Sequence, residues 1–196
     1  MTAPSSAPAP VPRSRFWAFL LKSFGWSPLL IDNRPPQSVM AVAPHTSNWD
    51  FIIGLVYYLA YYGRPNFLIK KEWFVFPLNY LFKSLGGVSV NREQGLGTVR
   101  AMADAFGKNP ILHLAITPEG TRAYTRKWKT GFLRIALQAD VPIEITKIDY
   151  KRKEVGILEV YRPTGNLEED LDYIRSFFSK EMAKYPRHFH GYHSHE

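Results

Sequence analysis

VMAVAPHTSNWDFIIGLVYYLAYY, residues 39–62, places a short polar stretch between two apolar segments. Its first five residues are typical of a buried strand, and its apolar second half is long enough to form a helix. Ser47 and Asp50 have the spacing of a capping box, so we expect the helix to begin near Asn48. A strand followed directly by a helix is the building unit of an α/β sheet.

The same alternation of strands and helices continues along the chain. Short runs of β-forming residues predict strands near 39–43, 66–69, 88–90, 111–117, 143–150 and 155–161. Apolar periodicity predicts helices over 48–62, 73–84, 96–107, 130–138 and 167–184. The predicted fold class is therefore α/β: a single layered domain with a mixed, mostly parallel central sheet flanked by helices.

Composition and charge narrow the function classes. The chain has 196 residues, of which 45% are hydrophobic and 21% charged, as in an ordinary globular domain. It contains no cysteine, which excludes disulfide scaffolds and cysteine nucleophiles. A net charge of +8 favours anionic partners such as nucleic acid, an anionic membrane or phosphorylated small molecules. The longest uncharged stretch, residues 51–63, is too short for a spanning helix.

The two ends of the chain differ from its middle. Residues 1–12 hold four prolines and no charge, which indicates a disordered tail rather than a secretory signal. The pattern of residues 13–31 predicts an N-terminal amphipathic helix whose charged residues lie opposite an aromatic face. That face holds Phe16, Phe19, Leu20 and Phe24, opposite Arg15 and Lys22. The helix either associates with a membrane or packs on the core. A main domain over 32–187 and a His-rich tail over 188–196 complete the predicted organisation.

His45 and Asp50 are the first candidate catalytic pair. With His45 in the loop and Asp50 in the first helical turn, the imidazole can fold back onto the carboxylate. One ring nitrogen is then fixed by Asp50, and the other is free to take a proton from a hydroxyl. The alternative is that Asp50 only caps the helix and His45 is an ordinary loop residue.

Two further stretches contain arginines suited to phosphate binding. TPEGTR, residues 117–122, ends a predicted strand and opens a stretch with five basic residues and one acid. Arg122 beside a glycine turn could hold a phosphate with two hydrogen bonds, although a solvated basic loop is the alternative. Arg92, at the exit of GGVSVNR, residues 86–92, could be a second phosphate ligand or simply an exposed arginine.

Taken in order, four pieces of the sequence resemble the PlsC-like glycerolipid acyltransferases, the family of lysophosphatidate acyltransferase. They are His45-x4-Asp50, Gly87 to Arg92, Glu119-Gly120-Thr121-Arg122 and Val141-Pro142. The resemblance implies that His45 is the catalytic base with Asp50 as its partner. It implies that the acceptor is bound by Arg92, Glu119, Gly120, Thr121 and Arg122.

The resemblance also implies a reaction and its partners. The family transfers a fatty acyl group from acyl-CoA or acyl carrier protein to a hydroxyl of a lysophospholipid such as 1-acyl-glycerol-3-phosphate. Neither a metal nor a cofactor is implied, and the expected location is peripheral, on the cytoplasmic face of an anionic membrane. Thr117, Ala123 and residues 124–129 depart from the usual pattern beside the acceptor site, which leaves a different amphiphilic acceptor open.

Two other classes of function compete with this interpretation. A non-catalytic module for anionic lipid would use only the basic surface and the amphipathic helix. Nucleic-acid binding agrees with the charge but lacks any recognised binding motif, so we expect no nucleic-acid partner.

Overall fold

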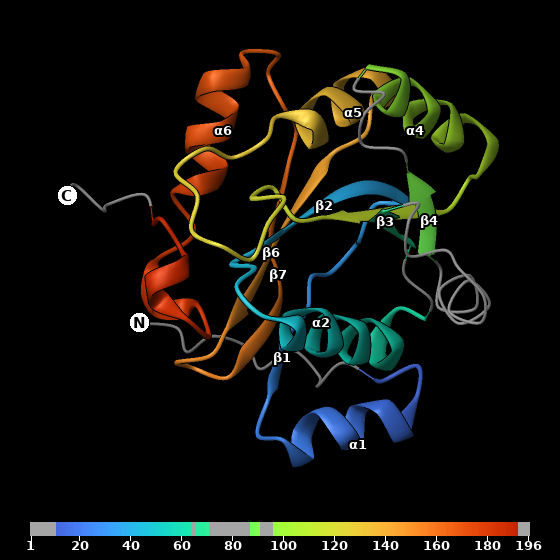
Figure 1. The fold of residues 1–196 in the computed structure, drawn as a ribbon. Helices are drawn as coiled ribbons and strands as arrows, with labels where there is room; N and C mark the ends of the chain where they lie inside the picture. Colours follow the sequence, from blue (N-terminus) through green and yellow to red (C-terminus); the bar gives the residue numbers. More distant parts are fainter. Residues whose placement is uncertain (1–10, 64–65, 71–86, 91–95, 192–196) are drawn as a thin grey trace, which may run out of the picture.

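The computed structural model describes residues 11–63, 66–70, 87–90 and 96–191, which form one sheet with helices on both faces (Figure 1). The seven strands among the described residues are β1 (Ser27–Leu29), β2 (Gln37–Ala43), β3 (Asn66–Lys70), β4 (Gly87–Val90), β5 (Leu112–Ile116), β6 (Ile143–Asp149) and β7 (Glu154–Tyr161). Their order across the sheet is β1-β7-β6-β2-β5-β3-β4. All neighbouring strands run parallel except β6 and β7. The predicted mixed, mostly parallel sheet is confirmed.

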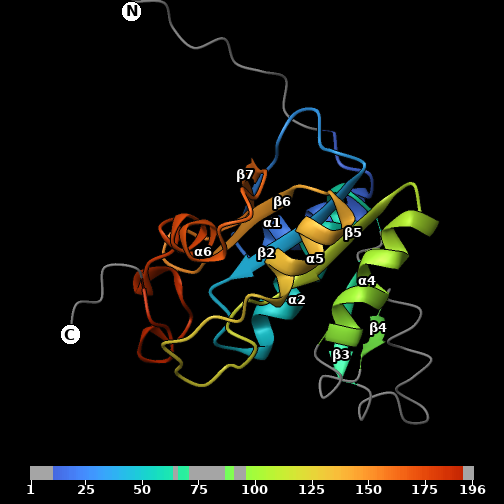
Figure 2. The same ribbon diagram turned by 90° about the horizontal axis from the view of Figure 1, so that it is seen from above.

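The helices form a layer on each side of the sheet. They are α1 (Arg15–Ser23), α2 (Asn48–Tyr61), α4 (Leu96–Lys108), α5 (Gly131–Ala139) and α6 (Leu167–Arg175). Helices α1 and α2 cover one face, and α4, α5 and α6 cover the other (Figure 1). Seen from above, α5 lies over the middle of the sheet, with α6 and α4 toward opposite ends (Figure 2). The helix predicted over 73–84 lies outside the described residues.

Alternating side chains of β2 explain the two layers. Val39, Ala41 and Ala43 are buried in the cluster that contains α5 residues such as Phe132, while Val42 packs against the cluster under α2. Because successive side chains of a strand point to opposite faces, one central strand supplies both cores. Burial on both faces is typical of parallel sheets.

A buried polar network lies at the amino ends of the central strands. Arg34, before β2, donates to both carboxylate oxygens of Glu144 in β6 at 2.8 and 2.7 Å and to the hydroxyl of Tyr58 in α2 at 3.0 Å. His113 in β5 lies beside the same carboxylate at 3.6 Å. These contacts join the start of the sheet to the end of α2.

The sequence predicts one helix over 13–31, but the structure has two elements there, α1 and β1. Helix α1 ends at Ser23 because Gly25 adopts a left-handed conformation with φ of 76°. The backbone N–H of Trp26 then donates to Leu21 at 3.2 Å, and β1 follows as a parallel edge strand beside β7. Because Trp26 is buried, the end of this segment belongs to the main domain.

The C-terminal part also differs from the prediction. Helix α6 ends at Arg175 rather than residue 184. The Ser176 hydroxyl donates to the Tyr173 carbonyl at 2.6 Å and competes with the helical hydrogen bonds. Two short 3-10 helices follow, η3 (Lys180–Met182) and η4 (Pro186–His188). Phe189 is buried, so the domain extends past the predicted start of a His-rich tail at residue 188.

Within the described ranges, every helix falls short of the length and apolarity needed to cross a bilayer.

Candidate active site

Loop 44–47, between β2 and α2, is built as the sequence predicts. Ser47 caps the helix, and its side chain accepts from the backbone N–H of Trp49 at 3.2 Å. Asp50 completes the capping box: its Oδ2 accepts from the backbone N–H groups of Thr46 and Ser47, each at 2.7 Å. The carboxylate is therefore held at a helix amino end, where backbone dipoles stabilise negative charge.

His45 folds back onto this carboxylate. Its Nδ1 lies 3.4 Å from Oδ2 of Asp50, a separation at which charges interact but longer than an optimal hydrogen bond. The Asp50 side chain is 2% exposed and that of His45 is 20% exposed. Because Nδ1 faces Asp50, the outer nitrogen Nε2 remains for a hydroxyl group of a substrate.

Glu119 reaches the same loop from the turn after β5. Its Oε1 accepts from the backbone N–H of His45 at 2.7 Å, while its Oε2 is buried and has no hydrogen-bond partner in the described structure. Burial raises the pKa of Glu119 to about 7. Glu119 therefore supports the backbone of His45, a contact that the sequence does not predict.

The basic loop, defined as residues 119–130, borders this site. Gly120 has φ of 64°, a backbone conformation that favours glycine. The Lys129 side chain lies so close that a Cβ at Gly120 would come within 3.0 Å of it. Thr121 and Arg122 are exposed, and Arg122 has no ion pair in the described part of the chain. Arg122 is thus accessible to an anionic ligand.

Arg92 lies outside the described residues, so the structure does not place it relative to His45. Pro142 directly precedes β6, and its carbonyl accepts from Val39 in β2 at 3.0 Å. Pro142 therefore lies at the amino ends of these strands, whereas His45 follows the carboxyl end of β2.

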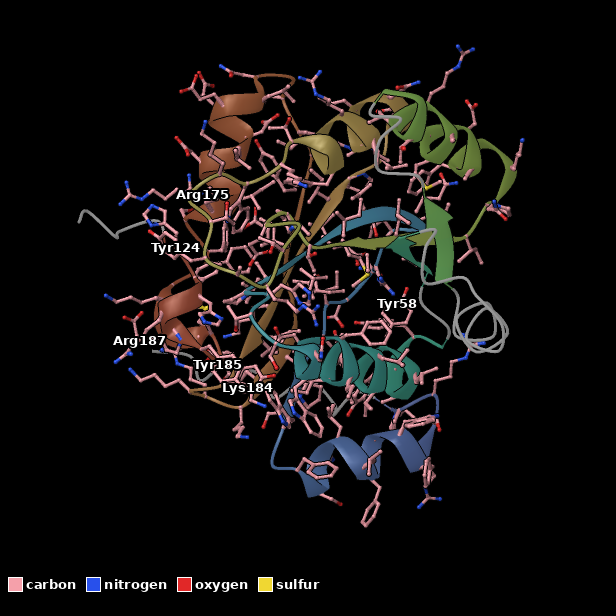
Figure 3. The ribbon with its side chains drawn as sticks, viewed as in Figure 1. Tyr58, Tyr124, Arg175, Lys184, Tyr185 and Arg187 are labelled. Atoms are coloured by element: carbon pink, nitrogen blue, oxygen red, sulfur yellow. The ribbon has the colours of Figure 1, made fainter. Side chains whose placement is uncertain are left out.

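The C-terminal segment, defined as residues 180–191, closes one side of the site. The backbone N–H of Tyr185 donates to Thr46 Oγ1 at 3.3 Å, and Phe189 packs on Trp128 of the basic loop. Figure 3 shows Lys184, Tyr185 and Arg187 on this segment and Tyr124 on the facing loop. The segment thus joins loop 44–47 to the basic loop.

Tyr150, directly after β6, also reaches the site. Its hydroxyl donates to Oδ1 of Asp50 at 2.7 Å. The Nζ of Lys184 lies 5.8 Å from the Tyr150 ring and 5.0 Å from the Trp49 ring. Neither Tyr150 nor Lys184 belongs to a motif that the sequence analysis identified.

Comparisons with known proteins identify the family of the chain and a similar fold. The model of the Acyltransferase family matches residues 30–144. The fold is similar to the crystal structure of the 1-acyl-sn-glycerophosphate (LPA) acyltransferase PlsC from Thermotoga maritima, with a TM-score of 0.57 and 19% identity. The similarity covers 83% of this chain and 73% of that one. No curated protein matches the sequence.

Proposed function

The chain belongs to the acyltransferase family, and we propose that it transfers a fatty acyl group from an acyl thioester to a hydroxyl of a lysophospholipid. The observation that carries this proposal is the pairing of His45 with the buried carboxylate of Asp50 at the carboxyl end of β2. Ligands of open α/β sheets bind at the carboxyl ends of the strands. A 1-acyl-glycerol-3-phosphate acceptor also suits the adjoining basic loop.

The chemistry begins with the acceptor hydroxyl at Nε2 of His45. The imidazole takes the hydroxyl proton while the oxygen attacks the thioester carbonyl, and Asp50 stabilises the resulting imidazolium. Collapse of the tetrahedral intermediate breaks the carbon–sulfur bond, and His45 returns the proton to the leaving thiolate. Each proton is thus accounted for without a covalent acyl-enzyme.

Basic side chains beside the dyad would bind the anionic parts of the substrates. In this proposal Arg122 holds the acceptor phosphate, and Gly120 and Thr121 shape the turn that presents it. Arg92 is a second proposed phosphate ligand, on the strength of its motif alone. The donor is acyl-CoA or acyl carrier protein, both of which are thioesters with anionic carriers.

Helix α1 is the proposed membrane contact. Phe16, Phe19 and the C-cap residue Phe24 are 65%, 70% and 67% exposed, and the basic residues Arg15 and Lys22 belong to the same helix. The adjacent start of α2 also exposes apolar side chains, Trp49, Phe51 and Ile52. An aromatic and basic surface of this kind binds at the interface of an anionic membrane, which we propose to be the cytoplasmic leaflet.

The decisive experiment measures release of free thiol from acyl-CoA, with and without a lysophospholipid. We expect acceptor-dependent release by the wild type and loss of at least about a hundredfold in rate for His45→Ala, since general base catalysis contributes on that scale. His188→Ala is the matched control because His188 is exposed in η4. Lipid binding without thiol release would instead support a non-catalytic lipid-binding module.

A further inference from the structure

Asp50 is bound by more partners than a helix cap requires. Its Oδ2 accepts two backbone N–H groups and faces His45, whereas its Oδ1 accepts the hydroxyl of Tyr150. Asp50 is 2% exposed, so water has little access to replace a lost partner. The orientation and charge distribution of this carboxylate therefore depend on Tyr150 as well as on loop 44–47.

Tyr150 is itself held firmly in place. Its backbone N–H donates to the carbonyl of Met182 at 2.8 Å, which ties it to the C-terminal segment. Its ring packs edge to face on the buried Trp26, with centroids 5.1 Å apart. The ammonium of Lys184 approaches the same ring. These contacts restrict the tyrosine to the position from which its hydroxyl reaches Asp50.

We propose that Tyr150 is a positioning residue for the dyad, holding the Asp50 carboxylate so that Oδ2 faces His45 and sharing its negative charge. This inference rests on the proposed acyl transfer. Tyr150 lies outside the residues that the family model matches, so it is a feature of this chain beyond the matched region.

Electrostatics support a donor role for the hydroxyl. Burial and the hydrogen bond to Asp50 raise the pKa of Tyr150 well above its usual range, so it keeps its proton at neutral pH. In the described part of the chain, the other charged or titratable groups with contacts to the dyad or Tyr150 are Glu119, at the His45 backbone, and Lys184 and Tyr185, beside Tyr150. None of these donates to Oδ1 in the described structure.

A second tyrosine–aspartate pair provides a matched control. The Tyr161 hydroxyl in β7 donates to Oδ1 of the buried Asp170 in α6 at 2.6 Å, away from His45. Tyr161→Phe therefore removes the same kind of bond, with a similar effect on stability, but leaves the dyad untouched. Any effect particular to Tyr150→Phe reports on the dyad.

The test compares Tyr150→Phe, Tyr161→Phe and the wild type by thiol release over a range of pH. Without the phenol, more negative charge resides on the carboxylate facing His45, the imidazolium is stabilised, and the acid limb of the profile moves to higher pH. We expect a shift of about half a unit or more. We also expect kcat to fall about tenfold with little change in KM, as for a lost hydrogen bond to a charged group.

For Tyr161→Phe we expect lower thermal stability but an unshifted acid limb. An acid limb that stays in place in Tyr150→Phe, moves to lower pH, or moves equally in Tyr161→Phe overturns the inference. Titration of the His45 ring by NMR, without substrate, reads the same shift independently of turnover. A wild type that releases no thiol would refute the proposed function, whereas the NMR comparison would still decide the role of Tyr150.

Discussion

The Glu119 carboxyl combines deep burial with an unpaired oxygen. One oxygen supports the His45 backbone, and the other has no partner in the described structure. Burial raises the pKa of Glu119 to about 7 in the folded protein, whereas in the unfolded chain this carboxyl ionises near its usual pKa of 4.5. The stability that Glu119 contributes is present below pH 4.5 and is lost as the pH rises through about 7.

Glu119→Gln should therefore change how stability depends on pH. The amide keeps an acceptor for the His45 N–H and cannot ionise, so the variant should gain stability relative to the wild type as pH rises from 5 to 8. At pH 8 the gain in the free energy of unfolding is on the order of 3 kcal/mol. Urea unfolding at several pH values measures it. A stability difference that is the same at pH 5 and pH 8 would contradict the raised pKa.

Arg122 is the residue whose side chain we expect to meet the acceptor phosphate. Arg122→Lys keeps the charge but loses the two-pronged hydrogen bond, so KM for a phosphorylated lysolipid should rise about tenfold. Thermal stability should hardly change because Arg122 is exposed and has no ion pair within the described ranges.

The measurement compares a phosphorylated acceptor with its unphosphorylated analogue. Arg100→Lys, the same change on the exposed side of α4, serves as the control. An equal rise in KM for both acceptors would contradict the assignment of Arg122 to the phosphate site.

At the residue scale, local spacing predicts the dyad but not its support. The capping box between Ser47 and Asp50 follows from residues three apart, which a single helical turn brings together. Tyr150 and Glu119 come from 100 and 74 residues away, so only the sheet topology brings them to the loop. No spacing in the sequence indicates those two contacts.

Among the elements, α1 has a dual character. Its buried side, with Ala18 and Leu21, packs against the domain, and its opposite side exposes Phe16 and Phe19, followed by the exposed Phe24 at the C-cap. Both interpretations of the sequence thus describe part of the helix: it packs on the core and also presents an aromatic surface. Deleting residues 1–31 would also remove β1 and the buried Trp26, so point substitutions test the surface more cleanly.

Replacing Phe16, Phe19 and Phe24 together by serine should reduce binding to anionic vesicles at least tenfold while leaving thermal unfolding nearly unchanged. Each lost ring removes apolar surface from the membrane interface but little from the core. Sedimentation with vesicles of anionic lipid measures binding, and binding by the wild type should also weaken with added salt. Undiminished sedimentation of the triple variant would show that α1 is not the anchor.

Periodicity predicts elements well where one helix or strand lies between clear boundaries. The observed α2, α4 and α5 agree with their predicted ranges to within a residue or two. The prediction fails where a local competitor ends a helix early: Gly25 after α1 and Ser176 after α6. The edge strand β1 is missed because three residues are too few to show an alternating pattern.

On the scale of the whole molecule, the C-terminal segment connects parts of the site that come from distant regions of sequence. It contacts Thr46 through Tyr185, Tyr150 through Met182 and the basic loop through Phe189. The Phe189 ring lies 6.2 Å from that of Trp128, which in turn packs on Phe178. The end of the fold therefore stabilises the loops that border the dyad.

Phe189→Ala should destabilise the protein by about 3 kcal/mol because it leaves a cavity beside Trp128. The basic loop then loses part of its packing, so amide hydrogen exchange in residues 119–130 should accelerate more than exchange in α2, whose Tyr57 belongs to the other hydrophobic cluster. His188→Ala, a change at an exposed neighbour, should leave both measurements near wild type. Urea unfolding gives the first quantity and exchange followed by mass spectrometry the second. Uniformly faster exchange throughout the chain would mean that Phe189 stabilises the whole fold and does not stabilise the basic loop in particular.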